Sequence, residues 1–140
     1  YEDVLSDDVE IVLSERGAAV DIEALEGLQM AMKNYQNGDF AQAIPAFEQY
    51  LQSSTKEYKG REVRFYLAIA QLGTAQTPKA IKNLKGLVED SSFKHQIDAQ
   101  WYLALAYIKN EQKQEAKKWL EELRNSNYKD KVTQLLETLE

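Results

Sequence analysis

The chain has 140 residues, with no cysteine, one histidine, six glycines and two prolines. Its length fits a single domain with a substantial core, and the shortage of glycine and proline favours helices. The lack of cysteine excludes disulfides, thiol catalysis and thiolate metal sites. The formal net charge of −6 argues against a nucleic-acid-binding protein, because such proteins need clustered positive charge.

The acidic residues are concentrated at the N-terminus. Residues 1–26 contain nine acidic residues and one arginine, which leaves a net charge of +2 for the rest of the chain. We expect residues 1–21 to form an acidic leader or tether arm and residues 22–140 to form the folded body. Within the leader, the apolar run Val9–Leu13 is compatible with an extended arm or with a short helix between Ser6 and Gly17.

A membrane-spanning segment is not recognisable in the sequence. No run approaches the ~20 consecutive apolar residues that cross a bilayer, and no signal peptide is present. We therefore expect a soluble segment that makes no membrane contact itself. The chain begins at Tyr1 instead of methionine, so we expect an excised piece or a processed product, and an upstream membrane anchor would lie outside this sequence.

The body repeats itself with a period of about 35 residues. Alanine recurs at two positions of the repeat and a large apolar residue at a third, namely Ala31, Ala68 and Ala104, then Ala43, Ala80 and Ala116, then Phe47, Leu84 and Leu120. An aromatic residue followed by lysine recurs at Tyr58-Lys59, Phe93-Lys94 and Tyr128-Lys129. Self-similarity at this period is typical of stacked helical hairpins.

Helical spacing is present within each repeat, as in Phe65, Ala68, Ile69 and Leu72. Thr77-Pro78 predicts a helix start with the threonine as N-cap, and Gly38-Asp39 predicts the end of one helix and the cap of the next. The predicted helices are 22–36, 40–53, 60–73, 78–89, 94–109, 113–125 and 129–139. These make three antiparallel pairs and a closing helix.

The recurring alanines predict where the paired helices cross, because only a short side chain lets two helix backbones approach closely. The expected facing pairs are Ala31 with Ala43, Ala68 with Ala80, and Ala104 with Ala116. The last predicted helix has apolar residues that would cover the final hairpin as a terminal cap, namely Val132, Leu135, Leu136 and Leu139.

These repeats resemble the tetratricopeptide repeat, a helix–turn–helix unit of 34 residues. The first unit matches the family pattern through Ala31, Gly38, Ala43 and Phe47. The second unit has Ala75, and the third Glu111, where the family has glycine. The resemblance implies an all-α fold, a right-handed α–α superhelix of three hairpin units over 22–56, 57–91 and 92–126, with a capping helix over 127–140.

A narrower resemblance is to bacterial repeat domains that follow a single membrane-spanning helix. It rests on the acidic leader, on Gly38–Ile44, on Phe65–Ala68 and on Gln100–Tyr107. It implies the periplasmic part of a membrane-anchored protein. Without an anchor, we expect a cytoplasmic domain.

The family resemblance also implies a binding surface, because the first helix of each pair lines the concave face in this family. The positions that map to this strip are Leu28, Met32, Tyr35, Phe65, Ile69, Leu72, Trp101, Leu105 and Ile108. One interpretation is a groove for an apolar or amphipathic peptide, since so large an apolar strip is seldom left uncovered. The other is that the mapping is out of register and some of these residues belong to the core.

The predicted function is a non-enzymatic module or scaffold that binds a protein or peptide partner. No catalytic constellation, cofactor motif or metal-ligand spacing is present, and the single His95 is expected at the surface. The alternative is a structural domain that self-associates through the leader and the apolar strip. Residues 1–20 could dock on that strip within a chain or between chains, or could serve only as a mobile tether.

Overall fold

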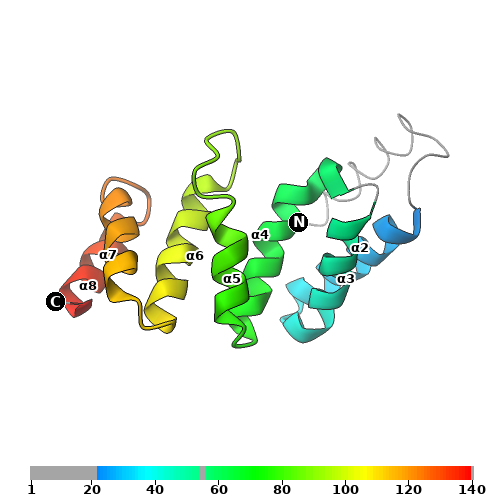
Figure 1. The fold of residues 1–140 in the computed structure, drawn as a ribbon, viewed down its shortest axis with the longest axis horizontal. Coiled ribbons are helices and arrows are strands. Elements are labelled where there is room, and N and C mark those ends of the chain that lie inside the picture. Colours follow the sequence, from blue (N-terminus) through cyan, green and yellow to red (C-terminus); the bar gives the residue numbers. More distant parts are fainter. Residues whose placement is uncertain (1–21, 54–55, 140) are drawn as a thin grey trace. The chain divides into compact units, whose positions relative to one another are not determined.

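The computed structural model describes residues 22–53 and 56–139, so the predicted leader 1–21 lies outside the described residues. All regular structure in the described ranges is α-helical, which confirms the predicted class (Figure 1). The seven helices are α2 Ile22–Gln36, α3 Phe40–Gln52, α4 Lys56–Gly73, α5 Thr77–Lys85, α6 Gln96–Lys109, α7 Lys113–Glu122 and α8 Lys129–Leu139.

The helix bounds are close to those predicted, and the two larger differences have local causes. α4 begins at Lys56, before the predicted position 60, and the non-helical backbone of Lys59 (φ −127°, ψ 22°) kinks the helix between the two positions. α5 ends at Lys85, short of the predicted 89. The turns that follow bury Val88, whose carbonyl oxygen accepts hydrogen bonds from the side-chain amides of Gln96 (3.0 Å) and Gln100 (2.9 Å) on α6.

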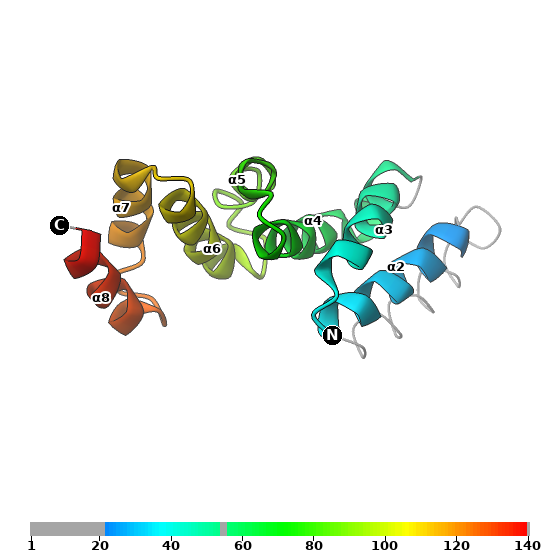
Figure 2. The same cartoon turned by 90° about the horizontal axis from the view of Figure 1, so that it is seen from below.

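The chain divides into two compact units between Thr74 and Ala75. In the first unit, α3 packs against both α2 and α4. In the second, α6 packs against α5 and α7, and α7 packs against α8 (Figure 2). The boundary lies between α4 and α5, the two helices that the sequence pairs in the predicted unit 57–91.

The core of the first unit consists of the apolar faces of α2, α3 and α4. Ala31 on α2 and Ala43 on α3 are completely buried in this packed pair, as expected of residues at a helix crossing. Phe47 and Tyr50 fill the space beside them and are also fully buried. At the end of α4, a Cβ added to Gly73 would lie only 2.5 Å from Cδ2 of Phe40, so glycine is required for this ring to pack.

The turns between paired helices share one backbone feature, a residue in the left-handed region. Gly38 (φ 83°), Ala75 (φ 61°) and Glu111 (φ 59°) occupy the position where the repeat pattern places glycine. Since a side chain in this region costs about 1–2 kcal/mol, Ala75 and Glu111 are strained.

Backbone hydrogen bonds stabilise the turns that follow α2 and α6. The amides of Gly38 and Asp39 donate to the carbonyls of Tyr35 (3.1 Å) and Asn34 (2.8 Å). In the same way, the amides of Glu111 and Gln112 donate to those of Ile108 (3.0 Å) and Tyr107 (2.8 Å). Both sets form the Schellman motif, which satisfies carbonyls at the end of a helix.

Of the two cap predictions, the position of Asp39 is confirmed and that of Thr77 is wrong. Asp39 is the N-cap of α3, but its side chain makes no capping hydrogen bond. Thr77 is not an N-cap, because α5 begins at Thr77 itself and Gln76 occupies the cap position. Thr77 is buried instead, so its position is governed by packing.

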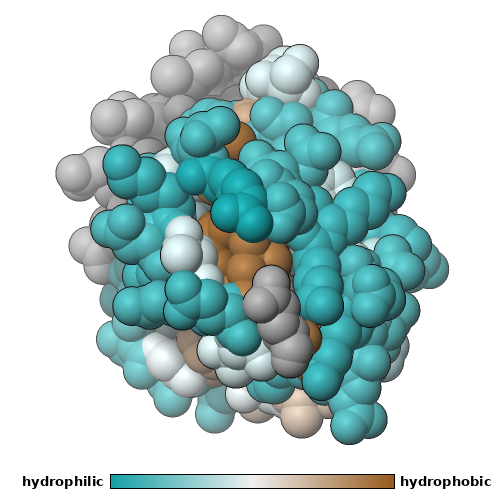
Figure 3. Space-filling model, turned by 90° about the vertical axis from the view of Figure 1, so that its left-hand side faces the viewer, coloured by the Kyte–Doolittle hydropathy of each residue, from teal (hydrophilic) through white to brown (hydrophobic). Residues whose placement is uncertain are grey.

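The core of the second unit follows the same plan. Ala104 on α6 and Ala116 on α7 are completely buried, as are Leu120 and Leu123. Val132, Leu136 and Leu139 on α8 are buried as predicted for a cap, whereas Leu135 is half-buried. Seen from the end formed by α7 and α8, a small hydrophobic area remains visible among hydrophilic side chains (Figure 3).

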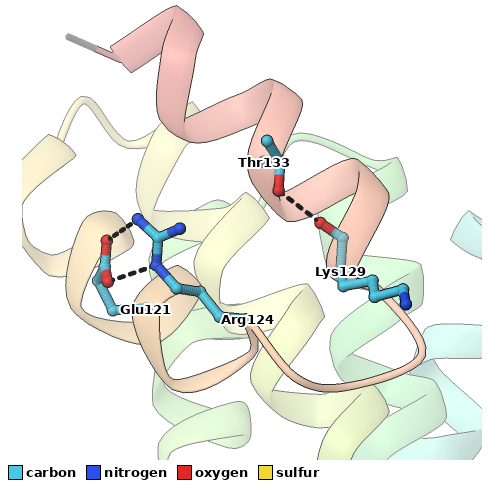
Figure 4. Close-up of polar contacts among 4 residues, drawn as sticks. All are labelled: Glu121, Arg124, Lys129 and Thr133. Atoms are coloured by element: carbon cyan, nitrogen blue, oxygen red, sulfur yellow. Dashed lines mark hydrogen bonds and ion pairs between the residues drawn. The ribbon is translucent and has the colours of Figure 1, made fainter.

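Local polar contacts lie on both sides of the connection between α7 and α8. Nε and Nη2 of Arg124 donate to the two carboxylate oxygens of Glu121 at 2.7 and 2.8 Å (Figure 4). These hydrogen bonds lower the pKa of Glu121 below its usual value. In the first turns of α8, the hydroxyl of Thr133 donates to the carbonyl of Lys129 at 3.0 Å (Figure 4).

Candidate peptide-binding groove

The six predicted groove residues of the first unit differ in exposure. Leu28 and Met32 on α2 belong to the core that α3 and α4 complete, with exposed fractions of 1% and 3%. Phe65 and Leu72 on α4 are also buried. Tyr35 and Ile69 are half-buried. Of the six predicted groove residues in the first unit, only Tyr35 on α2 and Ile69 on α4 thus keep an accessible part.

Tyr35 is the centre of an aromatic cluster, which we define as Tyr35, Phe40, Phe47 and Tyr66. Its ring centroid lies 5.5 Å from that of Phe40, 6.2 Å from that of Phe47 and 5.2 Å from that of Tyr66. These rings come from α2, α3 and α4, and their tilted and edge-on geometries are favourable for aromatic pairs. The cluster holds the half-exposed Tyr35 ring in a defined position.

In the second unit, Trp101 is buried by a residue far away in sequence. Tyr128, just before α8, stacks on Trp101 with ring centroids 4.8 Å apart and an angle of 10° between the planes. The Tyr128 hydroxyl donates a hydrogen bond to Oδ1 of Asp98, on the first turn of α6. Leu105 and Ile108, the other two predicted groove residues of this unit, are half-buried on α6.

The Tyr128 hydroxyl is held protonated by its surroundings. Burial, the hydrogen bond to Asp98 and the negative charge of Asp98 together raise its pKa well above the usual value near 10. His95, the N-cap of α6, also approaches Asp98, with Nδ1 3.7 Å from Oδ2. We call Asp98, Trp101 and Tyr128 the clamp, because they join α6 to the segment that leads into α8.

The predicted groove residues thus fall into two groups. Leu28, Met32, Phe65, Leu72 and Trp101 are at least nine-tenths buried. They contribute to the core of their units and are shielded from a partner in this conformation. Tyr35, Ile69, Leu105 and Ile108 are half-buried and carry the accessible part of the predicted strip.

A hollow in the second unit was not predicted from the sequence. It has a volume of about 370 Å³ and is lined by α5, the C-terminal end of α6 and the first turn of α7. Its lining combines apolar, amide and charged side chains, and contains none of the nine predicted residues. The sequence feature nearest to this hollow is the set of three lysines at positions 79, 82 and 85 of α5. Lysines at such spacing are typical of an ordinary solvated helix face, so they did not predict a binding site.

The described part of the chain offers neither a metal site nor a membrane-spanning helix. No group of histidine, cysteine or acidic residues there is arranged to hold a metal ion. No helix among residues 22–53 and 56–139 is long and apolar enough to cross a membrane.

Comparison with known proteins gives one match. The family model for the tetratricopeptide repeat matches residues 98–128, which comprise most of α6, all of α7 and the connection to Tyr128. No curated protein and no solved structure matches the chain. The matched residues overlap the stretch 92–126, where the sequence places its third repeat, and tetratricopeptide repeats generally serve in protein–protein interaction.

Proposed function

We propose that this chain is a non-enzymatic interaction module that binds an apolar or amphipathic peptide along its first helices. The observation that carries the proposal is the tetratricopeptide repeat at residues 98–128, together with half-buried apolar residues on its first helix. Leu105 and Ile108 lie on α6 at a spacing of three residues, so they share one face. Two such side chains suit the spaced anchors of an amphipathic peptide.

The first unit supports the same proposal through Tyr35 and Ile69. Both are half-buried, and Tyr35 is fixed by the aromatic cluster. A ring held in place before binding loses little conformational entropy when a partner covers it, which favours tight binding. The buried members of the predicted strip then act indirectly, by positioning these side chains.

The acidic leader 1–21 is proposed as an internal competitor for the same surface. It combines seven acidic residues with the apolar run Val9–Leu13, and the rest of the chain is close to neutral. An upstream membrane anchor and a periplasmic location belong to the proposal as well, and rest only on the narrower resemblance described above.

A peptide-binding experiment tests the interaction proposal. A random peptide display library is selected against the full chain, and the affinity of an enriched peptide is then compared among variants. Ile69→Glu and Leu105→Glu should each weaken binding by about tenfold or more, because a charge would be desolvated under the bound peptide. Met30→Glu is the matched control, since Met30 is 61% exposed and lies outside the strip.

The outcomes are distinct. Equal affinity of all three variants, with circular dichroism unchanged, contradicts the groove. Removal of residues 1–20 should raise the affinity if the leader occupies the surface, and should leave it unchanged if the leader is only a tether. Sedimentation at several concentrations tests the alternative, since self-association that Leu105→Glu abolishes would support homo-oligomerisation.

A further inference from the structure

The solvent-facing side of α5 carries only positive charge. Lys79, Lys82 and Lys85 are all exposed, and residues 77–88 contain no acidic residue. In the described part of the chain, none of these three lysines takes part in an ion pair. Lys82 and Lys85 suit the negative end of the helix dipole, but Lys79 stands near the positive end, where a cation is unfavourable. Stabilisation of α5 therefore does not account for all three.

The hollow described above begins beside this basic side. Its apolar lining residues are Pro78 and Ile81 on α5 and Tyr107 on α6; Pro78 is exposed, whereas Ile81 and Tyr107 are mostly buried. Lys85 on α5 and Glu115 in the first turn of α7 also line the hollow. The lining of the hollow thus combines apolar side chains with one positive and one negative side chain.

The lining also holds an amide donor that has no acceptor among residues 22–53 and 56–139. Nδ2 of Asn110 donates a hydrogen bond of 2.6 Å to Oε1 of Gln112, so the Gln112 carbonyl oxygen is in use. The amide nitrogen of Gln112 keeps its two hydrogens for another acceptor. Both side chains are exposed and line the hollow. A peptide carbonyl or a carboxylate is the kind of group that such a donor recognises.

We propose that this hollow binds an acidic peptide segment in which one apolar side chain is flanked by carboxylates. The apolar side chain packs on Pro78 and on the exposed edges of Ile81 and Tyr107, while carboxylates lie toward Lys85 and Lys82. Glu115 repels a carboxylate on its own side, so the acidic residues of the peptide are directed toward α5. This site is separate from the predicted groove, because none of the nine groove residues lines it.

The charges favour a peptide over a nucleic acid. A nucleic acid presents phosphates at regular spacing and needs positive charge along the whole contact surface. Here Glu115 stands in the lining, Glu111 precedes it in the adjoining turn, and the whole chain carries −6. A short acidic segment can place its carboxylates on the basic side alone.

Nuclear magnetic resonance titration of the full chain tests the proposal directly. The probe is the capped synthetic peptide Glu-Glu-Leu-Glu-Glu, and the comparison peptides replace its glutamates by glutamine or its leucine by alanine. We expect saturable shifts of the backbone amides of residues 81–86 and 110–115. Both comparison peptides should bind more weakly, and added salt should weaken the acidic peptides but not the glutamine peptide.

Two variants and a matched control sharpen the test. The double variant Lys82→Glu/Lys85→Glu should lose affinity by about tenfold or more, whereas Glu115→Gln should gain about twofold. Lys118→Glu/Lys129→Glu makes the same change in net charge at exposed positions outside the hollow. It should change the affinity by less than about twofold if the site is specific.

Several results would overturn the proposal. An equal loss in the two double variants would mean that only net charge attracts the peptide. Shifts centred on other residues, or equal binding of the glutamine peptide, would also contradict the site. These outcomes leave the proposed groove unaffected, because its test uses Ile69→Glu and Leu105→Glu.

Discussion

Each unit buries alanines where two of its helices cross, but different side-chain contacts connect the helices inside each unit. In the first unit, rings from three consecutive helices meet in the aromatic cluster around Tyr35. In the second, the clamp joins α6 to a residue 30 positions further along the chain. The first arrangement is continuous apolar packing, whereas the second combines a stacked ring pair with a hydrogen bond to a carboxylate.

This difference shows that the same repeat pattern can be completed by different side-chain contacts. The large apolar residue that recurs in the repeat is Phe47 on α3 in the first unit and Leu120 on α7 in the second unit. Both side chains are completely buried. A ring at this position reaches other rings, while leucine does not. The second unit supplies its aromatic contact elsewhere, through Trp101 and Tyr128.

The largest expected effect comes from truncation of these equivalent residues. Phe47→Ala should destabilise the fold by about 3–5 kcal/mol and Leu120→Ala by about 2–5 kcal/mol, since each leaves a cavity in a packed core. Urea unfolding followed by circular dichroism measures both. Met30→Ala is the control, because the exposed Met30 should cost less than about 0.5 kcal/mol. A smaller loss for Phe47→Ala than for Met30→Ala would refute the role given to the aromatic cluster.

The close contact between Gly73 and Phe40 predicts the next effect. Gly73→Ala places a Cβ against the Phe40 ring and should cost about 1–3 kcal/mol through displacement of the ring. Gly60→Ala, on the same helix, meets no atom within 4 Å and should instead stabilise by up to about 1 kcal/mol. Thermal unfolding of the two variants should therefore shift in opposite directions, and a shared direction would contradict the contact.

The clamp of the second unit is tested by Tyr128→Phe, which keeps the ring and removes the hydrogen bond to Asp98. We expect a loss of about 1–2 kcal/mol at neutral pH. The folded state keeps the Tyr128 proton above pH 10, where the unfolded chain loses it, because the pKa of Tyr128 is raised. The stability that this group contributes is therefore complete below pH 10 and falls as pH rises further.

The difference in stability between the native chain and Tyr128→Phe should accordingly shrink above pH 10. Fluorescence-detected unfolding is suitable, because Trp101 contacts the Tyr128 ring. A difference that stays constant from pH 8 to pH 11 would show that the hydroxyl is not protected as described.

The smallest expected effects concern the two Schellman turns, which have the same geometry with different residues. Gly38→Ala should destabilise by about 1 kcal/mol, since the added side chain meets no neighbour and only the left-handed backbone opposes it. Glu111→Gly should stabilise by up to about 1 kcal/mol, because it removes the same strain at an exposed position. Denaturant midpoints that move in the same direction would contradict a common backbone cause.

The sequence by itself determined the helices, their order and the positions of the turns. These features depend on local spacing and on the repeat period, so Gly38, Ala75 and Glu111 could be placed at equivalent positions without a structure. The buried alanines Ala31, Ala43, Ala104 and Ala116 were predictable for the same reason.

Only the tertiary structure decided which apolar residues are buried and which remain accessible. α6 illustrates the reason, because Trp101 and the run Leu103–Ile108 place apolar residues on several of its faces. Periodicity cannot then tell which face is covered. Trp101 is buried because Tyr128 lies on it, and that contact depends on how the chain turns after α7. The division of the predicted strip into core and surface is set by such distant neighbours.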